Sequence, residues 1–122
     1  MNIRIITIGK LKEQYLKDAL KEYEKRLSAL CKFFVTEITS EQITDESLFE
    51  KYKELEADKI LQAIKPNSYI ITLEIKGKKL SSEEFAQKIK DISNNGFSDI
   101  LFIIGGANGL SKRVSDIANL RL

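Results

Sequence analysis

Residues 99–110 of this chain read DILFIIGGANGL, and this stretch indicates the fold class. Residues 100–105 carry almost no polarity, and the turn-forming sequence GANG follows directly. A short apolar run bounded by turn residues is typical of a strand that is buried on both faces of a parallel sheet. Glycines after such a strand let backbone N–H groups approach a ligand, and open α/β sheets bind ligands beyond the carboxyl ends of their strands. Residues 105–109 are therefore a candidate ligand loop.

The rest of the sequence alternates between strand and helix patterns. Apolar runs rich in β-branched residues predict strands at residues 2–9, 31–39, 68–75 and 99–104. Apolar residues three and four positions apart predict helices at residues 10–30, 48–64, 81–95 and 111–118. This alternation predicts a single α/β domain over residues 1–122, with a parallel or mostly parallel sheet and helices on both faces.

Capping residues mark several of the expected helix starts. Ser81 and Glu84 form the S-x-x-E capping box of the third helix, and Ser111 is placed to cap the last helix. Ser40, Thr44 and Asp45 are candidate caps of the second helix, so its start is less sharply defined.

Composition limits the chemistry and the location of the protein. The chain has no histidine, which excludes His-based triads and His-ligated zinc sites, and its single cysteine excludes an intrachain disulfide. Its apolar segments are shorter than the roughly 20 residues that a membrane span needs, and the N-terminus lacks a signal-peptide pattern. We therefore expect a cytoplasmic protein with no metal site and no association with membranes.

The glycine loop leaves the identity of its ligand open. It is neither a P-loop nor a dinucleotide-binding fingerprint, because it lacks G-x-x-x-x-G-K-[ST] and follows the last predicted strand instead of the first. Its dense glycines fit either an adenine or ribose bound close to the backbone or simply a tight strand-to-helix turn. Leu73, near the end of the third strand, is either one flank of an adenine site or an ordinary core leucine.

Charged residues near the end of the third strand are further candidates. Glu74 is a candidate general acid or base, although a single carboxylate is a weak signal. Lys76, Lys78 and Lys79 form a small cationic loop, which suits phosphate contacts and equally suits plain solvation.

The first predicted helix is basic. The net charge of the chain is only +2, but residues 10–32 hold seven basic and four acidic residues. Lys17, Lys21, Lys25 and Arg26 could present a cationic face to phosphate, although an ordinary solvated helix surface explains the same charges. A non-enzymatic RNA- or ribosome-binding α/β module is therefore one alternative function.

Three segments together resemble one protein family. IRIITIGKLKEQYLKDALKEYEKRL (residues 3–27), PNSYIITLEIKGKKLSSEEFA (residues 66–86) and FIIGGANGLS (residues 102–111) resemble, in collinear order, the RlmH family of SPOUT-class, knotted methyltransferases. The resemblance covers essentially the whole chain. It implies a SPOUT-like fold of the α/β-knot type. It also implies an S-adenosylmethionine-dependent enzyme that methylates N3 of a pseudouridine in 23S rRNA on the assembled ribosome, working as a homodimer.

The resemblance also assigns roles to particular residues. It implies that Leu73 and Gly105 bind the cofactor, with Gly106 beside them, and it assigns no catalytic residue. Members of the family continue for a further strand and a helix beyond the equivalent of Leu122. The resemblance therefore implies a C-terminally incomplete SPOUT-like methyltransferase domain that lacks the knot-forming segment. The alternative to an active methyltransferase is then a catalytically inactive truncated form.

Overall fold

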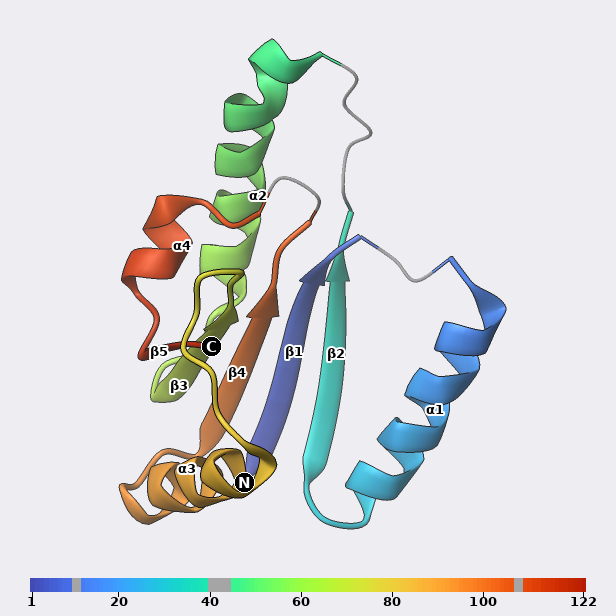
Figure 1. Cartoon of the computed structure of the whole chain (residues 1–122), viewed down its shortest axis with the longest axis vertical. Helices are drawn as coiled ribbons and strands as arrows, with labels where there is room; N and C mark the ends of the chain where they lie inside the picture. The colour runs from blue at the N-terminus through green and yellow to red at the C-terminus, as the bar shows by residue number, and fades with distance from the viewer. Residues whose placement is uncertain (10–11, 40–44, 107–108) are drawn as a thin grey trace.

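The computed structural model describes residues 1–9, 12–39, 45–106 and 109–122. This described part is built around a five-stranded sheet in which all the strand pairs are parallel (Figure 1). The strand order is β2-β1-β4-β3-β5, so β4 lies between β1 and β3. The strands are β1 (Asn2–Ile8), β2 (Lys32–Ile38), β3 (Ser68–Leu73), β4 (Asp99–Ile104) and β5 (Leu120–Arg121). The predicted parallel sheet is confirmed.

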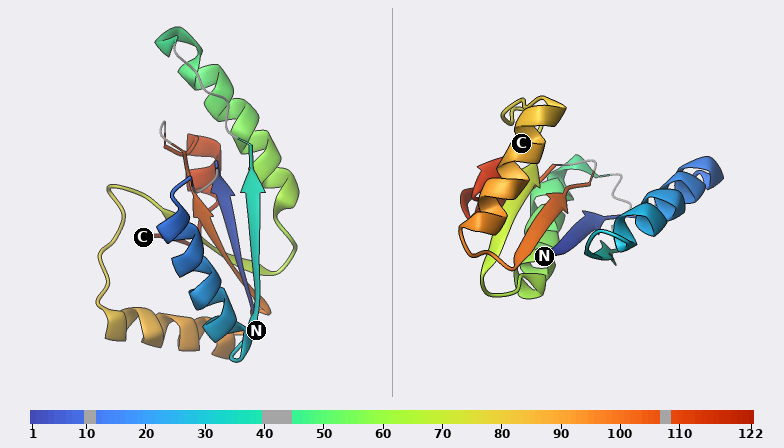
Figure 2. Two further views of the ribbon diagram at one scale, coloured as in Figure 1. Left: turned by 90° about the vertical axis from the view of Figure 1, so that its right-hand side faces the viewer. Right: turned by 90° about the horizontal axis from the view of Figure 1, so that it is seen from below.

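Helices lie on both faces of the sheet, as the sequence predicts. They are α1 (Gln14–Ser28), α2 (Phe49–Ala63), α3 (Ser82–Asn94) and α4 (Lys112–Asp116), with a 3-10 helix, η1 (Glu46–Leu48), directly before α2. α2 and α4 cover one face, whereas α1 and α3 lie on the other (Figure 2). The chain therefore leaves β3 and β4, which are neighbouring strands, toward opposite faces.

The sheet divides the core into two apolar clusters. On one side Ile103 of β4 packs with Ile60 of α2 and Val114 of α4, and none of the three is more than 1% exposed. On the other side Ile100 of β4 packs with Ile92 of α3. Because successive strand residues face opposite sides of a sheet, a strand that is apolar at nearly every position contributes to both clusters.

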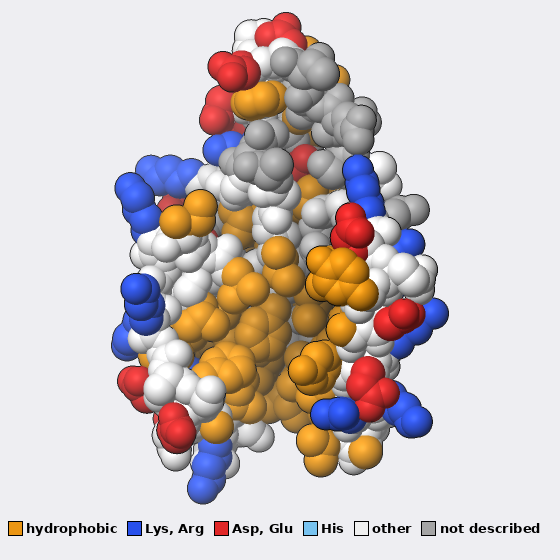
Figure 3. Space-filling model, turned by 45° about the vertical axis from the view of Figure 1, so that its right-hand side comes forward, with side chains coloured by type: hydrophobic (Ala, Val, Ile, Leu, Met, Phe, Trp, Pro, Cys, Tyr) orange, Lys and Arg blue, Asp and Glu red, His pale blue; other side chains and the backbone are white. Residues whose placement is uncertain are grey.

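The face that carries α1 and α3 is covered only in part. α1 stands away from the sheet, and none of its residues is fully buried. Leu20 of α1 lines a cavity of about 260 Å³ together with Ile5 and Val35, and apolar side chains gather in a hollow on this side of the molecule (Figure 3). The apolar stripe that predicts α1 is largely uncovered, with Tyr15 70% exposed and Tyr23 61% exposed.

The end of the chain differs from the prediction. The last helix ends at Asp116 instead of Ala118, and a two-residue strand follows, β5, which the sequence pattern does not reveal. Asn119 accounts for the difference. Its backbone N–H donates to the carbonyl oxygen of Ile70, and its side-chain oxygen accepts from the N–H of Ile70, both at 2.8 Å. These two bonds draw the chain out of the helix and onto the edge of β3.

The other element ends agree closely with the patterns. α1 begins at Gln14, later than the predicted start at residue 10: residues 10–11 lie outside the described residues, whereas residues 12–13 are described and are not helical, since Glu13 is an extended N-cap. β3 ends at Leu73, two residues earlier than predicted, because the backbone then leaves the sheet to form a turn in which the N–H of Gly77 donates to the carbonyl oxygen of Glu74.

The predicted caps of α3 and α4 are present, with Ser81 and Ser111 at their starts, whereas α2 begins without a side-chain cap. The Ser81 hydroxyl accepts from the N–H of Glu84, and the Glu84 carboxylate accepts from the N–H of Ser81, both at 3.1 Å. These two bonds confirm the capping box and lower the pKa of Glu84. Asp45 caps η1, whereas Ser40 and Thr44 lie outside the described residues.

Candidate functional site

A pocket lies at the carboxyl edge of the sheet, between the ends of β3 and β4. The chain turns toward α3 after β3 and toward α4 after β4, so the two loops separate and leave a crevice between them. The volume of the pocket is about 460 Å³, within the range of roughly 300–1,000 Å³ for small-molecule sites. Its lining residues are Leu73, Glu74, Ile75, Lys76, Ile104, Gly105, Gly106, Gly109 and Leu110.

One wall of the pocket is the glycine loop after β4. The N–H of Gly109 donates to the carbonyl oxygen of Gly106 at 3.0 Å, and Gly109 has a φ of +78°, a conformation that favours glycine. A Cβ at Gly105 would lie 3.0 Å from both the carbonyl carbon of Gly109 and Cγ of Leu110. A side chain therefore has little room at this position. Residues 107–108 of the predicted loop lie outside the described residues.

The opposite wall is apolar and comes from the end of β3. Leu73 is 39% exposed and Ile75 is fully exposed, so neither side chain belongs to the core clusters. The interpretation of Leu73 as an ordinary core leucine is therefore wrong. The structure brings Leu73, Gly105 and Gly106 together around one pocket, and their role in cofactor binding stays a prediction.

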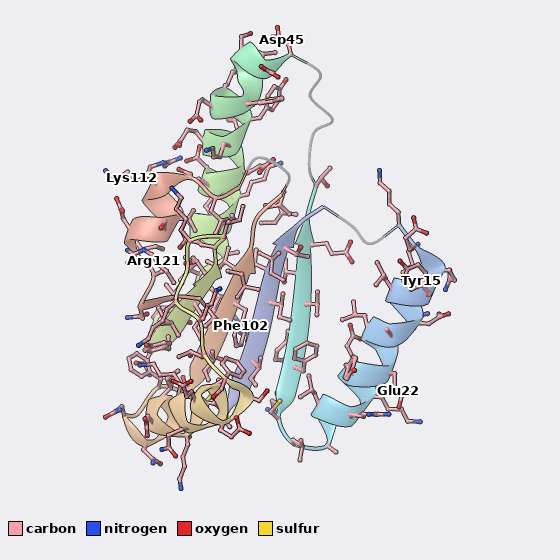
Figure 4. All side chains as sticks on the ribbon, viewed as in Figure 1. Tyr15, Glu22, Asp45, Phe102, Lys112 and Arg121 are labelled. Carbon is pink, nitrogen blue, oxygen red and sulfur yellow. The ribbon has the colours of Figure 1, made fainter. Side chains whose placement is uncertain are left out.

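Glu74 lines the same pocket, but its carboxylate is held by neighbouring groups. Oε2 accepts from the Thr72 hydroxyl at 2.5 Å, and the Ser115 hydroxyl lies 2.9 Å from Oε1 and 3.1 Å from Oε2. Arg121, which Figure 4 labels, donates from Nε to the Ser115 hydroxyl at 3.1 Å. Its Nε lies 4.0 Å from Oε2 of Glu74. Because these contacts tie together β3, α4 and β5, we interpret Glu74 as an anchoring residue and not as a general acid or base.

The three lysines of the predicted cationic loop line two different cavities. Lys76 lines the pocket between β3 and β4. Lys78 and Lys79 line a separate cavity with Leu80, Phe85 and Leu122, on the side of the sheet that carries α3. Of the three lysines, only Lys76 is thus placed to contact a ligand in the pocket.

A polar cluster that the sequence does not reveal fixes the far end of the glycine loop. The buried hydroxyl of Ser111 donates to Oε1 of Glu54 on α2 at 2.6 Å, and Arg113 donates from Nε to Oε2 of Glu54 at 2.6 Å. Arg113 also donates to Asp58 at 2.9 Å. The hydrogen bonds from Ser111 and then Arg113 lower the pKa of Glu54, and those to Asp58 and Glu54 raise the pKa of Arg113. Glu54 and Ser111 lie far apart in the sequence, so no local motif could have predicted this contact.

Among residues 1–9, 12–39, 45–106 and 109–122, no cluster of three or more His, Cys, Asp or Glu side chains is arranged to hold a metal ion. Within the same ranges, no helix has the length and apolar character needed to cross a membrane.

Comparison with known proteins agrees with the three segments that suggest a family. A family model described as predicted SPOUT methyltransferase matches residues 1–122. Ribosomal RNA large subunit methyltransferase H from Clostridium acetobutylicum is 47% identical to this chain, and that from Ligilactobacillus salivarius is 46% identical. Each alignment covers this whole chain and 79% of the relative. The protein of the same name from Latilactobacillus sakei is 49% identical over 98% of this chain and 77% of the relative. Since the family model and these relatives match the sequence along its length, the chain belongs to the SPOUT methyltransferase family.

Proposed function

We propose that this protein transfers a methyl group from S-adenosylmethionine to N3 of a pseudouridine in 23S rRNA of the large ribosomal subunit. The observation that carries the proposal is the pocket between β3 and β4, in which the exposed side chain of Leu73 faces the glycine loop that begins at Gly105. The family supports a methyl donor as the ligand. The names of the relatives support large-subunit rRNA as the substrate.

The residues of the pocket suit this cofactor. Leu73 and Leu110 offer apolar surface for an adenine ring, and Gly105 and Gly106 let the backbone approach the ligand without intervening side chains. When bound, the cofactor supplies a methyl group that is already activated on a sulfonium. The protein therefore has mainly to hold donor and acceptor in the reacting geometry. The absence of histidine from the chain is compatible with this chemistry.

The finer details of the proposal rest on the resemblance to the RlmH family. They are the N3 position of a pseudouridine, the assembled ribosome as substrate, the cytoplasm as location and a homodimer as the working form of the complete protein. The uncovered apolar stripe of α1 is surface that a second copy could bury. Light scattering of the full-length protein measures its mass in solution, and a monomer at micromolar concentration would contradict the homodimer.

Binding of the cofactor is the first test. Calorimetric titration of S-adenosylmethionine into the full-length protein should show saturable binding with micromolar affinity, whereas ATP and NAD should give no comparable signal. Preferential binding of ATP or NAD would indicate a general nucleotide-binding domain instead. Binding of rRNA without any binding of S-adenosylmethionine would favour the non-enzymatic RNA-binding module.

Methyl transfer is the second test. Ribosomes from cells that lack the modification are incubated with the protein and S-adenosylmethionine, and the nucleosides of the 23S rRNA are analysed by mass spectrometry. The proposal predicts one new N3-methylpseudouridine per large subunit, and less with free 23S rRNA. A methyl group on another base or position would refute the proposed specificity but not the methyltransferase activity.

A further inference from the structure

The turn at residues 74–78, directly after β3, is bound to the end of the described chain. The N–H of Glu74 donates to the carbonyl oxygen of Leu122, and the N–H of Lys78 donates to the carbonyl oxygen of Arg121, both at 2.8 Å. Within the turn, the N–H of Gly77 donates to the carbonyl oxygen of Glu74 at 3.0 Å. The turn therefore holds the backbone of residues 121–122 from both of its ends.

Gly77 lies against the backbone of Leu122 with no room for a side chain. A Cβ built on Gly77 would overlap the carbonyl carbon and the carbonyl oxygen of Leu122, and it would also lie 3.0 Å from the carbonyl oxygen of Glu74. All three obstacles are backbone atoms, which cannot rotate away as the end of a side chain can. Any side chain at this position must therefore displace either the turn or the strand end that it holds.

Side chains fix the same turn from α4. The Ser115 hydroxyl bonds the Glu74 carboxylate, and the Thr72 hydroxyl bonds it from β3. Arg121 in turn donates to Ser115, so the contact joins the turn, α4 and β5. Ser115, like Gly77, is not among the residues that line the pocket.

The position of this turn determines the position of one pocket wall. Leu73, Ile75 and Lys76 line the pocket and immediately precede Gly77. Leu73 is the last residue of β3, so the two residues after Glu74 are placed by the turn and not by the sheet. A shift of the turn thus moves Ile75 and Lys76, which are part of the wall that faces the glycine loop.

We propose that Gly77 and Ser115 are positioning residues for the methyl donor: they touch no ligand themselves, and they hold the wall formed by residues 73–76 in the geometry that binds S-adenosylmethionine. This inference rests on the proposed function. It adds that affinity for the donor depends on contacts outside the pocket, between the 74–78 turn, α4 and residues 121–122.

The test compares three variants of the full-length protein by calorimetric titration with S-adenosylmethionine and by steady-state methylation of ribosomes. Gly77→Ala should raise both the Kd and the KM for the donor at least tenfold and leave kcat within about threefold of the wild type. Ser115→Ala, which removes one hydroxyl, should raise both constants about two- to fivefold. Gly96→Ala is the matched control, because Gly96 has a positive φ of +87° but lies in open space away from the pocket.

The pattern of constants separates positioning from general loss of structure. A variant that is merely less stable has fewer active molecules, which lowers the apparent kcat without changing the KM. Gly96→Ala should lower the melting temperature and leave the Kd unchanged. If Gly77→Ala does not fold, the Kd of Ser115→Ala decides the question.

Two outcomes separate the proposed function from the positioning role of Gly77 and Ser115. If the wild-type protein does not bind S-adenosylmethionine, the proposed function fails, and this inference fails with it. If the wild type binds but the folded variants Gly77→Ala and Ser115→Ala keep its Kd, the proposed function stands and the positioning role is refuted.

Discussion

Replacement of Gly105 by alanine tests the glycine wall of the pocket directly. The new Cβ would lie 3.0 Å from the carbonyl carbon of Gly109, 3.0 Å from Cγ of Leu110 and 3.1 Å from Cδ2 of Leu110. These separations are roughly 0.4–1 Å shorter than the optimal distance between carbon atoms. The Leu110 side chain can rotate, but the Gly109 backbone is held by its bond to Gly106 and by its left-handed conformation. The loop itself must therefore shift.

The expected loss of affinity follows from the energy of that shift. One additional methyl group in a packed site typically costs about 1–3 kcal/mol. If the loop relaxes in the free protein and must return to its original geometry to bind the ligand, this energy is subtracted from binding. A factor of ten in Kd corresponds to about 1.4 kcal/mol, so Gly105→Ala should weaken binding of S-adenosylmethionine about 5- to 150-fold.

Calorimetric titration of the full-length protein measures this effect. Gly96→Ala serves as the control, because it strains a glycine of positive φ at the other end of β4 and meets no atom within 4 Å. It should destabilise the protein without changing the Kd. A folded Gly105→Ala variant with wild-type affinity would show that the glycine loop does not form part of the cofactor site.

Three further predictions concern stability. Ser81→Ala removes the N-cap of α3 and should lower the free energy of unfolding by about 1 kcal/mol, which corresponds to a drop of about 4 °C in melting temperature. An unchanged melting temperature would contradict the capping box. The pKa of Glu54 is lowered by Ser111 and Arg113, so its contribution to stability is present above its ordinary pKa of 4.5 and is lost as the pH falls further. The difference in free energy of unfolding between wild type and Glu54→Gln should therefore shrink below pH 4.5, and a constant difference down to pH 3 would refute this. Ile103→Val should lower the free energy of unfolding in urea by about 0.5–1.5 kcal/mol, because Ile103 is fully buried. Ile75→Val, at a fully exposed position, should leave the free energy of unfolding unchanged. Equal effects of the two substitutions would contradict the burial of Ile103 and the exposure of Ile75.

The elements that have strong local patterns could be predicted from the sequence. The sequence predicts β4 with its observed bounds, because five apolar residues follow Asp99 and glycines come directly after them. The capping box of α3 needs only Ser81 and Glu84, three residues apart. The parallel sheet follows from the alternation of strands and helices, which requires crossover connections.

Features that depend on strand order could not be predicted in the same way. The pocket exists because β3 lies beside β4, although a helix separates the two strands in the sequence. Without that order, Leu73 could equally belong to the core. The sequence does not reveal β5 for a different reason: two residues carry no periodicity, and Asn119 places them through hydrogen bonds to Ile70 on β3.

α4 joins the two walls of the pocket although it has only five residues. At its start, Ser111 caps the helix and bonds Glu54, which fixes the exit of the glycine loop to α2. One turn later, Ser115 bonds Glu74, which fixes the wall that follows β3. Val114 lies between them and is fully buried in the core, so the helix has no freedom to move one wall without the other. The geometry of the pocket is therefore set by contacts of α4 as well as by the glycines that first identify the site.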